Sequence, residues 1–145
     1  MIQWQALLAG LTKFNFDSTF DQIEGRSISG MIGRSNEGQI MEACTIRHLH
    51  VADPFIAEAN ACLQAVLFMK DLRFRSVIVE GDSLTVIQKV NSSNPDMSIL
   101  NPIIQEIKTP SRDFDSIQFR FTYRKANGLA YLLAKEGCSL DSTSY

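Results

Sequence analysis

The chain has 145 residues, of which 45% are hydrophobic and 21% charged, and its formal net charge is −2 at pH 7. This length and balance are typical of one globular domain with a single hydrophobic core, and they exclude a disordered chain. The chain lacks the basic surplus of proteins that bind nucleic-acid backbones tightly and non-specifically, but an enzyme that binds its substrate weakly through metal ions remains compatible.

Along the chain, the first part predicts three antiparallel strands. Polar and apolar residues alternate over 13–17, and apolar side chains share one face of a second segment over 27–34. The residues 35–38 form a short turn signal, and a third strand follows over 39–47. Alternation is broken in this third strand, which predicts a β-bulge.

The rest of the chain predicts helices that alternate with two further strands. Asp53 and Pro54 are typical of a helix start, with an N-cap and a proline in the first turn. The apolar stripe of this helix is expected to be Phe55, Ala59, Cys62, Val66 and Met69. The following elements are expected to be a buried strand over 74–80, helices over 84–90 and 98–109 (the latter stopped by Pro110), a strand over 115–123 and a helix over 125–136.

The element order β-β-β-α-β-α-α-β-α predicts an α/β fold with a five-stranded mixed sheet flanked by helices. Three antiparallel strands are followed by two helix-connected strands. We expect residues 1–138 to form this one domain and residues 139–145 to be a frayed tail.

The cysteines and the N-terminus indicate the compartment. Cys44, Cys62 and Cys138 are odd in number and widely spaced, so we expect free thiols and neither a disulfide framework nor a structural zinc site. Residues 1–11 contain a short apolar stretch without a basic segment, so we expect no secretory signal and no membrane segment. We predict an intracellular protein, without a choice between nucleus and cytoplasm.

Three carboxylates occupy places that this fold would bring together. Asp17 lies inside the first strand, where burying a lone carboxylate costs several kcal/mol. Glu58 lies at the margin of the sheet-facing stripe of the first helix. Asp82 follows the most apolar strand at its C-terminal end, where parallel α/β units place ligand sites. Such acids repel one another unless a cation compensates, so the pattern predicts a site for Mg²⁺ or Mn²⁺ that could hydrolyse phosphodiesters.

Each acid taken alone has a simpler interpretation. Asp17 would be a turn or strand-end residue, Glu58 a solvated helix residue, and Asp82 the N-cap of the helix that begins at Leu84. The combination of order, spacing and element type favours a shared metal site.

The segments around these acids carry a recognisable set of motifs. They are KFNFDSTF at 13–20, SGMIGR at 29–34, AEANA at 57–61 and EGDS at 80–83, with RKAN at 124–127 in the segment of the last helix. With these motifs the chain resembles the ribonuclease H-like domain family of plants, also described as reverse-transcriptase-like and derived from non-LTR retroelements. The similarity extends from about Trp4 to Gly137.

This resemblance implies the ribonuclease H-like fold and a metal-dependent endonuclease that cuts the RNA strand of RNA–DNA hybrids. The catalytic residues and ligands of Mg²⁺ or Mn²⁺, with two ions expected, would be Asp17, Glu58 and Asp82. The residues in contact with the nucleic acid would be Ser83, Arg124 and Asn127. The expected partner is an RNA–DNA hybrid or another nucleic acid, with no membrane involved.

Some positions depart from the family pattern. Ser18 stands where the family usually has glycine, and Tyr131 stands at the position of a fourth acid on the last helix. Because tyrosine supplies no negative ligand, we expect weaker metal affinity at a second ion position. Arg124 replaces a frequent histidine and would contact a substrate phosphate or pair with an acid. The alternative is therefore a catalytically weak or inactive domesticated module that binds nucleic acid or protein.

Overall fold

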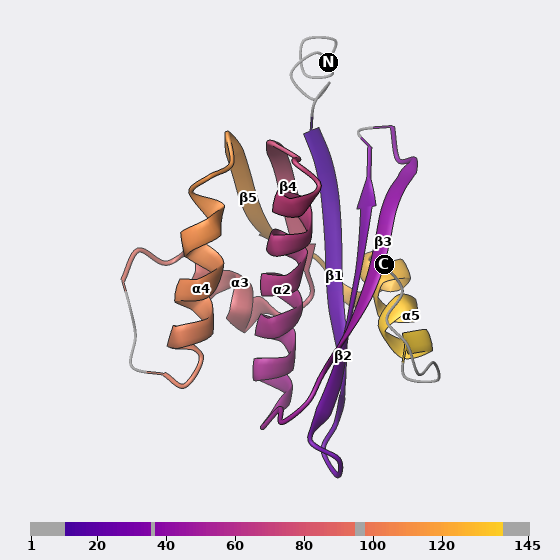
Figure 1. Ribbon diagram of the computed structural model, residues 1–145, viewed down its shortest axis with the longest axis vertical. Helices are drawn as coiled ribbons and strands as arrows, with labels where there is room; N and C mark the ends of the chain where they lie inside the picture. Colours follow the sequence, from indigo (N-terminus) through magenta and orange to yellow (C-terminus); the bar gives the residue numbers. More distant parts are fainter. Residues whose placement is uncertain (1–10, 36, 95–97, 138–145) are drawn as a thin grey trace.

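The computed structural model describes residues 11–35, 37–94 and 98–137, in which five strands form one mixed sheet (Figure 1). The strands are β1 (Leu11–Asp21), β2 (Arg26–Arg34), β3 (Ile40–His48), β4 (Ser76–Gly81) and β5 (Ser116–Phe121). The helical elements are α2 (Pro54–Asp71), α3 (Leu84–Asn91), α4 (Asn101–Ser111), the 3₁₀ turn η1 (Arg124–Asn127) and α5 (Gly128–Gly137). The predicted element order and the mixed five-stranded sheet are confirmed.

The sheet has the strand order β3-β2-β1-β4-β5. β1 pairs antiparallel with β2 and parallel with β4, and β5 adds a parallel edge strand next to β4. The predicted β-bulge is present, because Gly33 pairs with Glu42 whereas the next residue, Arg34, pairs with Ile40. This arrangement makes β1 the point at which the antiparallel and parallel halves meet.

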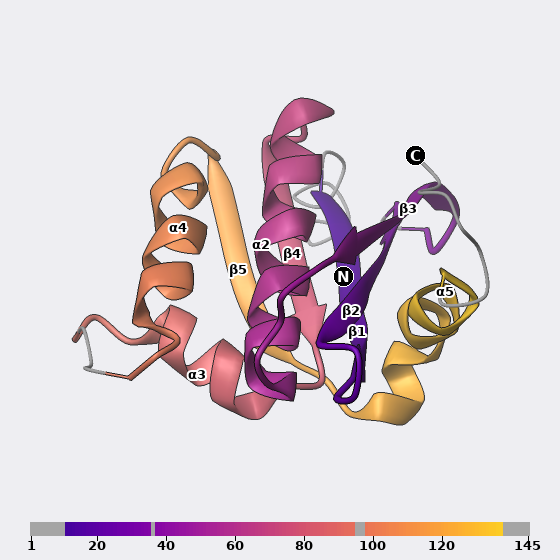
Figure 2. The same cartoon turned by 60° about the horizontal axis from the view of Figure 1, so that its bottom comes forward.

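Helices cover both faces of the sheet (Figure 2). α2 packs on β1 and β2 and against α4, while α5 packs on β1 and β2 from the opposite side. The main hydrophobic core lies under α2. Its largest fully buried apolar side chains include Phe14, Phe16, Met31, Val66 and Met69.

α2 starts where the sequence predicts. The side chain of Asp53 accepts a hydrogen bond from the backbone N–H of Ile56 at 2.8 Å, and Pro54 occupies the first turn. Four residues of the predicted stripe are buried, but the inclusion of Phe55 was wrong. Its side chain is 51% exposed because the first turn of α2 reaches into solvent.

Two helix boundaries differ from the prediction. α4 begins at Asn101, so Ile99 lies before the helix and is exposed. Pro110 does not stop α4 but lies in its last turn, where the hydroxyl of Ser111 donates to the carbonyl of Ile107 at 2.6 Å. The last predicted helix begins instead as the 3₁₀ turn η1, followed by α5.

α5 approaches the sheet closely at Gly30 of β2. A Cβ atom at this position would lie 2.5 Å from the carbonyl oxygen of Ala130 and 2.5 Å from the backbone nitrogen of Ala134. Real Cβ atoms are not found so close to backbone, so a glycine is required for this helix to lie on β2. The contact sets the distance between α5 and β2, and with it the positions of the residues on α5.

Gly30→Ala should therefore lower the free energy of unfolding by about 1–3 kcal/mol, because α5 must move away from β2. Gly128→Ala is the matched control, since a Cβ there would meet no atom within 4 Å and its backbone is helical. Urea unfolding of both variants measures the difference. Equal stability of the two would contradict the close packing of α5.

Cys44 and Cys62 are free thiols, as predicted, and both are buried. In the described ranges, no helix is both long and apolar enough to cross a membrane. The predictions for Cys138, for the apolar N-terminus at 1–10 and for a tail at 139–145 lie outside the described residues.

Candidate metal centre

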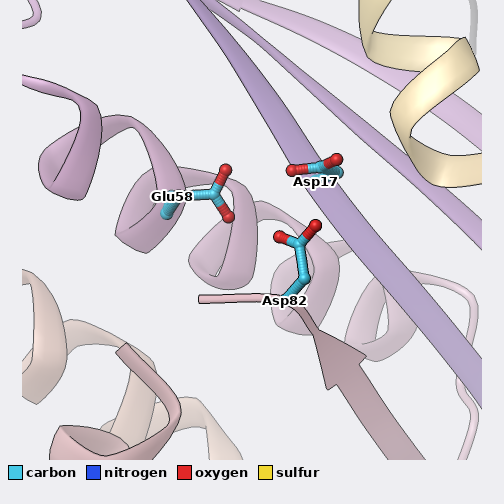
Figure 3. Close-up of side chains that lie close together, drawn as sticks. All are labelled: Asp17, Glu58 and Asp82. Atoms are coloured by element: carbon cyan, nitrogen blue, oxygen red, sulfur yellow. The ribbon is translucent and has the colours of Figure 1, made fainter. Parts of the chain in front are cut away.

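Three carboxylates meet where β1 continues past the end of β4 (Figure 3). The parallel pairing of the two strands ends at Phe16 and Gly81, so Asp17 and Asp82 each lie one residue beyond it. Glu58 reaches the same place from α2. One carboxylate oxygen from each residue lies within 4.8 Å of the others. The structure thus brings together the three acids that the sequence singles out, hereafter the acidic cluster (Asp17, Glu58 and Asp82).

The acidic cluster is assembled from both faces of the sheet. Ser18 faces α2, and its hydroxyl donates to Oε1 of Glu58 at 2.5 Å. Because side chains alternate along a strand, Asp17 faces the opposite side, as does its cross-strand partner Gly30 under α5. The carboxylates can still meet, since β4 has ended and no strand separates the two faces at this point.

The simpler interpretations of the three acids disagree with the structure. Ser83, not Asp82, is the N-cap of α3, and its hydroxyl oxygen lies 3.5 Å from the backbone nitrogen of Val86. Asp17 lies within β1 and is 0% exposed, so it is not a turn residue. Glu58 is not a solvated helix residue, because its Oε2 atom is buried.

Burial and mutual repulsion make the acidic cluster electrostatically unfavourable without a cation. Burial, followed by the charge of Asp17, raises the pKa of Glu58 to about 9, although the hydrogen bond from Ser18 acts in the opposite direction. Burial and the charge of Asp17 also raise the pKa of Asp82, and Arg124 opposes this shift. The site therefore favours a bound proton or a bound cation over three free charges.

The oxygen atoms of the acidic cluster fit a divalent cation. Oδ1 of Asp17 accepts the backbone N–H of Ser18 at 2.8 Å, and Oε1 of Glu58 accepts the Ser18 hydroxyl. Within the described part of the chain, Oδ2 of Asp17, Oε2 of Glu58 and Oδ2 of Asp82 are buried but accept no hydrogen bond. Three such carboxylate oxygens form the donor set that Mg²⁺ and Mn²⁺ prefer.

Arg124 lies at the solvent side of the acidic cluster. Its Nη1 atom lies 3.6 Å from Oδ2 of Asp17, and its Nε atom lies 3.4 Å from Oδ2 of Asp82. The guanidinium carbon is 4.8 Å from the ring centroid of Tyr131, in a cation–π contact. Of the two roles considered for Arg124, the structure shows the pairing with acids.

Asn127 holds the segment that carries Arg124. Its Nδ2 atom donates to the backbone carbonyl of Phe16 at 2.7 Å, and its Oδ1 atom accepts from Asn15 at 3.0 Å. The predicted contact of Asn127 with substrate disagrees with this geometry, because the residue is 1% exposed and bonded within the protein. Its position anchors η1 to β1 and so places Arg124 beside the acidic cluster.

Ser18 is a site residue that the sequence analysis did not recognise. Its backbone N–H donates to Asp17 and its hydroxyl donates to Glu58. No local signal identifies this role, because the bond to Asp17 comes from the backbone N–H and the hydroxyl bonds to a residue of α2, 40 positions later. Ser83 is half-buried beside Asp82, where it caps α3.

A family model described as reverse transcriptase-like matches residues 15–137 of the chain. A comparison with curated proteins gave no match. Among solved structures, RNase H1 from the halophilic archaeon Halobacterium salinarum is similar, with 21% identity and a TM-score of 0.76 over 89% of this chain and 98% of that chain.

Two further structures have the same fold. The N-terminal RNase H domain of Rv2228c from Mycobacterium tuberculosis is 14% identical, with a TM-score of 0.79 over 89% of this chain and 94% of that chain. An RNase H1 isolated from compost, solved in complex with an RNA/DNA hybrid, is 14% identical, with a TM-score of 0.75 over 86% and 94%. The predicted RNase H-like fold is confirmed.

Proposed function

Because the chain belongs to the reverse transcriptase-like family, we propose that it is a metal-dependent endonuclease that cuts the RNA strand of RNA–DNA hybrids. The observation that carries the proposal is the acidic cluster. Its three carboxylates each place one oxygen within 4.8 Å of the others, and each has a buried oxygen that accepts no hydrogen bond in the described part of the chain. Two proteins of similar structure were solved in complex with an RNA/DNA hybrid, which supports the choice of substrate.

In this proposal Asp17, Glu58 and Asp82 hold Mg²⁺ or Mn²⁺, with two ions expected. Bound there, the ions would supply Lewis-acid stabilisation of the charge that develops on the phosphodiester during hydrolysis. Ser18 keeps Asp17 and Glu58 in place through its hydrogen bonds to both carboxylates. Burial of Asp17 excludes water from one side of the site and strengthens each charge interaction within it.

Two residues at the edge of the acidic cluster are proposed to contact the nucleic acid. The side chain of Arg124 is 60% exposed, and a guanidinium can bind a phosphate through two parallel hydrogen bonds. Ser83 is half-buried, and its hydroxyl hydrogen is free to donate because its oxygen serves as the acceptor in the helix cap. Arg124→Ala is therefore expected to raise the KM for hybrid.

A second candidate function is a binding module with weak or no catalysis. Tyr131 favours it, because its ring supports Arg124 and brings no carboxylate to the acidic cluster. The formal net charge of −2 also provides little attraction for a nucleic acid. The two functions differ in the response of the protein to an added acid at position 131.

Tyr131→Asp should lower the Mg²⁺ concentration that gives half-maximal hybrid cleavage by roughly tenfold, because a fourth negative charge faces the ions. Tyr131→Asn is the matched control, since asparagine has nearly the same shape as aspartate but carries no charge. Cleavage of a labelled hybrid over a Mg²⁺ series measures the shift. If both variants need as much Mg²⁺ as the original chain, position 131 does not limit metal binding.

A further inference from the structure

Arg124 provides a positive charge at the place where a divalent cation would bind. We propose that Arg124, supported by the ring of Tyr131, is a built-in counter-ion that competes with the metal ion for Asp17 and Asp82. This inference rests on the metal site of the proposed function. It adds that metal loading requires the guanidinium to leave the acidic cluster.

The contacts of Arg124 involve the same atoms that a metal would need. Its nitrogens lie 3.6 Å from Oδ2 of Asp17 and 3.4 Å from Oδ2 of Asp82. Both of these oxygens are buried and accept no hydrogen bond within the described residues. The two distances exceed the usual 2.7–3.2 Å of an N–H···O hydrogen bond, so the guanidinium compensates charge without tight bonds. An interaction of this kind is displaceable.

The position of Arg124 is fixed at its backbone and adaptable at its tip. Asn127 bonds to the carbonyl of Phe16 and thereby anchors the η1 segment to β1. The guanidinium rests on the Tyr131 ring at 4.8 Å. Because the side chain is 60% exposed, it can turn into solvent, or toward a substrate phosphate, without disturbing the core.

The positive charge of Arg124 determines whether this residue raises or lowers the affinity for metal. The acidic cluster holds three carboxylates within 4.8 Å, and Arg124 opposes the resulting repulsion. A divalent ion placed between Asp17 and Asp82 would be repelled by a guanidinium that stayed within 4 Å of the same oxygens. The metal-free protein is therefore stabilised by Arg124, whereas the affinity for metal is reduced by it.

The test measures Mn²⁺ binding by calorimetry on the whole chain, with Arg124→Gln compared with the original sequence. Removal of the competing charge should tighten Mn²⁺ binding by about tenfold. Arg75→Gln is the matched control, because Arg75 is equally exposed (61%) but pairs with Asp115 at 2.8 Å. Arg75→Gln should bind Mn²⁺ like the original chain. Asp17→Asn shows whether the heat comes from the acidic cluster.

Thermal unfolding gives a second readout that does not depend on catalysis. Arg124→Gln should have a lower melting temperature than the original chain without metal, and a larger increase on addition of Mn²⁺. Tyr131→Leu, which removes the supporting ring but keeps the charge, should lie between the two in Mn²⁺ affinity.

Equal or weaker Mn²⁺ binding by Arg124→Gln, with normal binding by the original chain, would overturn this inference alone. Absence of Mn²⁺ binding by every variant would overturn the proposed function together with it.

Discussion

Replacing Asp17 by asparagine should reduce hybrid cleavage by at least about a thousandfold, because a metal-assisted step loses several kcal/mol of charge stabilisation. Asp17 is the residue of the acidic cluster with 0% exposure, and it lies on β1 beside the end of β4 (Figure 3). Asparagine has nearly the same shape and can still accept the N–H of Ser18. The loss should therefore come from the missing charge.

The fold should survive this change. The substitution removes one of three mutually repelling charges, so the melting temperature of the metal-free protein should stay equal or rise. Asp113→Asn is the control, because this carboxylate is 59% exposed and pairs with Lys70 outside the acidic cluster. Purified variants are compared by cleavage rate and by melting temperature. Undiminished cleavage by Asp17→Asn would show that the activity arises elsewhere.

The second prediction with a large effect concerns the stability of the folded protein, which should depend on pH and on metal through the carboxyl group of Glu58. Its folded-state pKa of about 9 lies above the ordinary value of 4.5, so the folded protein retains a proton that the unfolded chain releases. The stability linked to this proton is fully present below about pH 4.5 and is lost as the pH rises toward 9. Without metal, the protein should lose stability between pH 5.5 and pH 8.5 through this group, by at most about 1.4 kcal/mol for each pH unit.

Divalent metal should reverse this trend, because metal binding requires the deprotonated carboxylates and releases protons. The increase of the melting temperature on addition of Mn²⁺ should therefore be small at pH 5.5 and large at pH 8.5.

Glu58→Gln isolates the contribution of this group. A comparison with the original chain is needed because other groups also have shifted pKa values; burial, for example, lowers the pKa of His48. The pH dependence of the metal-free variant should be flatter than that of the original chain, and its response to Mn²⁺ weaker. Glu106→Gln, at an exposed position of α4, should behave like the original chain. Identical pH dependence of stability in Glu58→Gln and Glu106→Gln would contradict the raised pKa of Glu58.

Much of the fold could be predicted because its signals are local. Alternation identified the first strands, and the pair Asp53 and Pro54 located the start of α2. The acidic cluster could also be predicted, because its members lie at element positions that the topology of the sheet brings together. A local pattern fails at element ends, as at Phe55, where burial depends on how far neighbouring elements extend.

The remaining features of the site depend on contacts between distant parts of the chain. Asn127 bonds to Phe16, 111 residues earlier, and no local pattern distinguishes this buried role from contact with substrate. The pairing of Arg124 with two acids similarly requires η1 to be anchored against β1. The role of Ser18 likewise depends on a distant residue, because its hydroxyl bonds to Glu58 of α2, 40 positions later.

The most direct test of the central claim is the cleavage of a hybrid with both strands labelled, using the purified chain in a series of Mg²⁺ or Mn²⁺ concentrations. The acidic cluster predicts metal-dependent cutting of the RNA strand, an intact DNA strand, and loss of cutting when the metal is chelated. No cleavage at any metal concentration, or cleavage that persists in chelator, would contradict it.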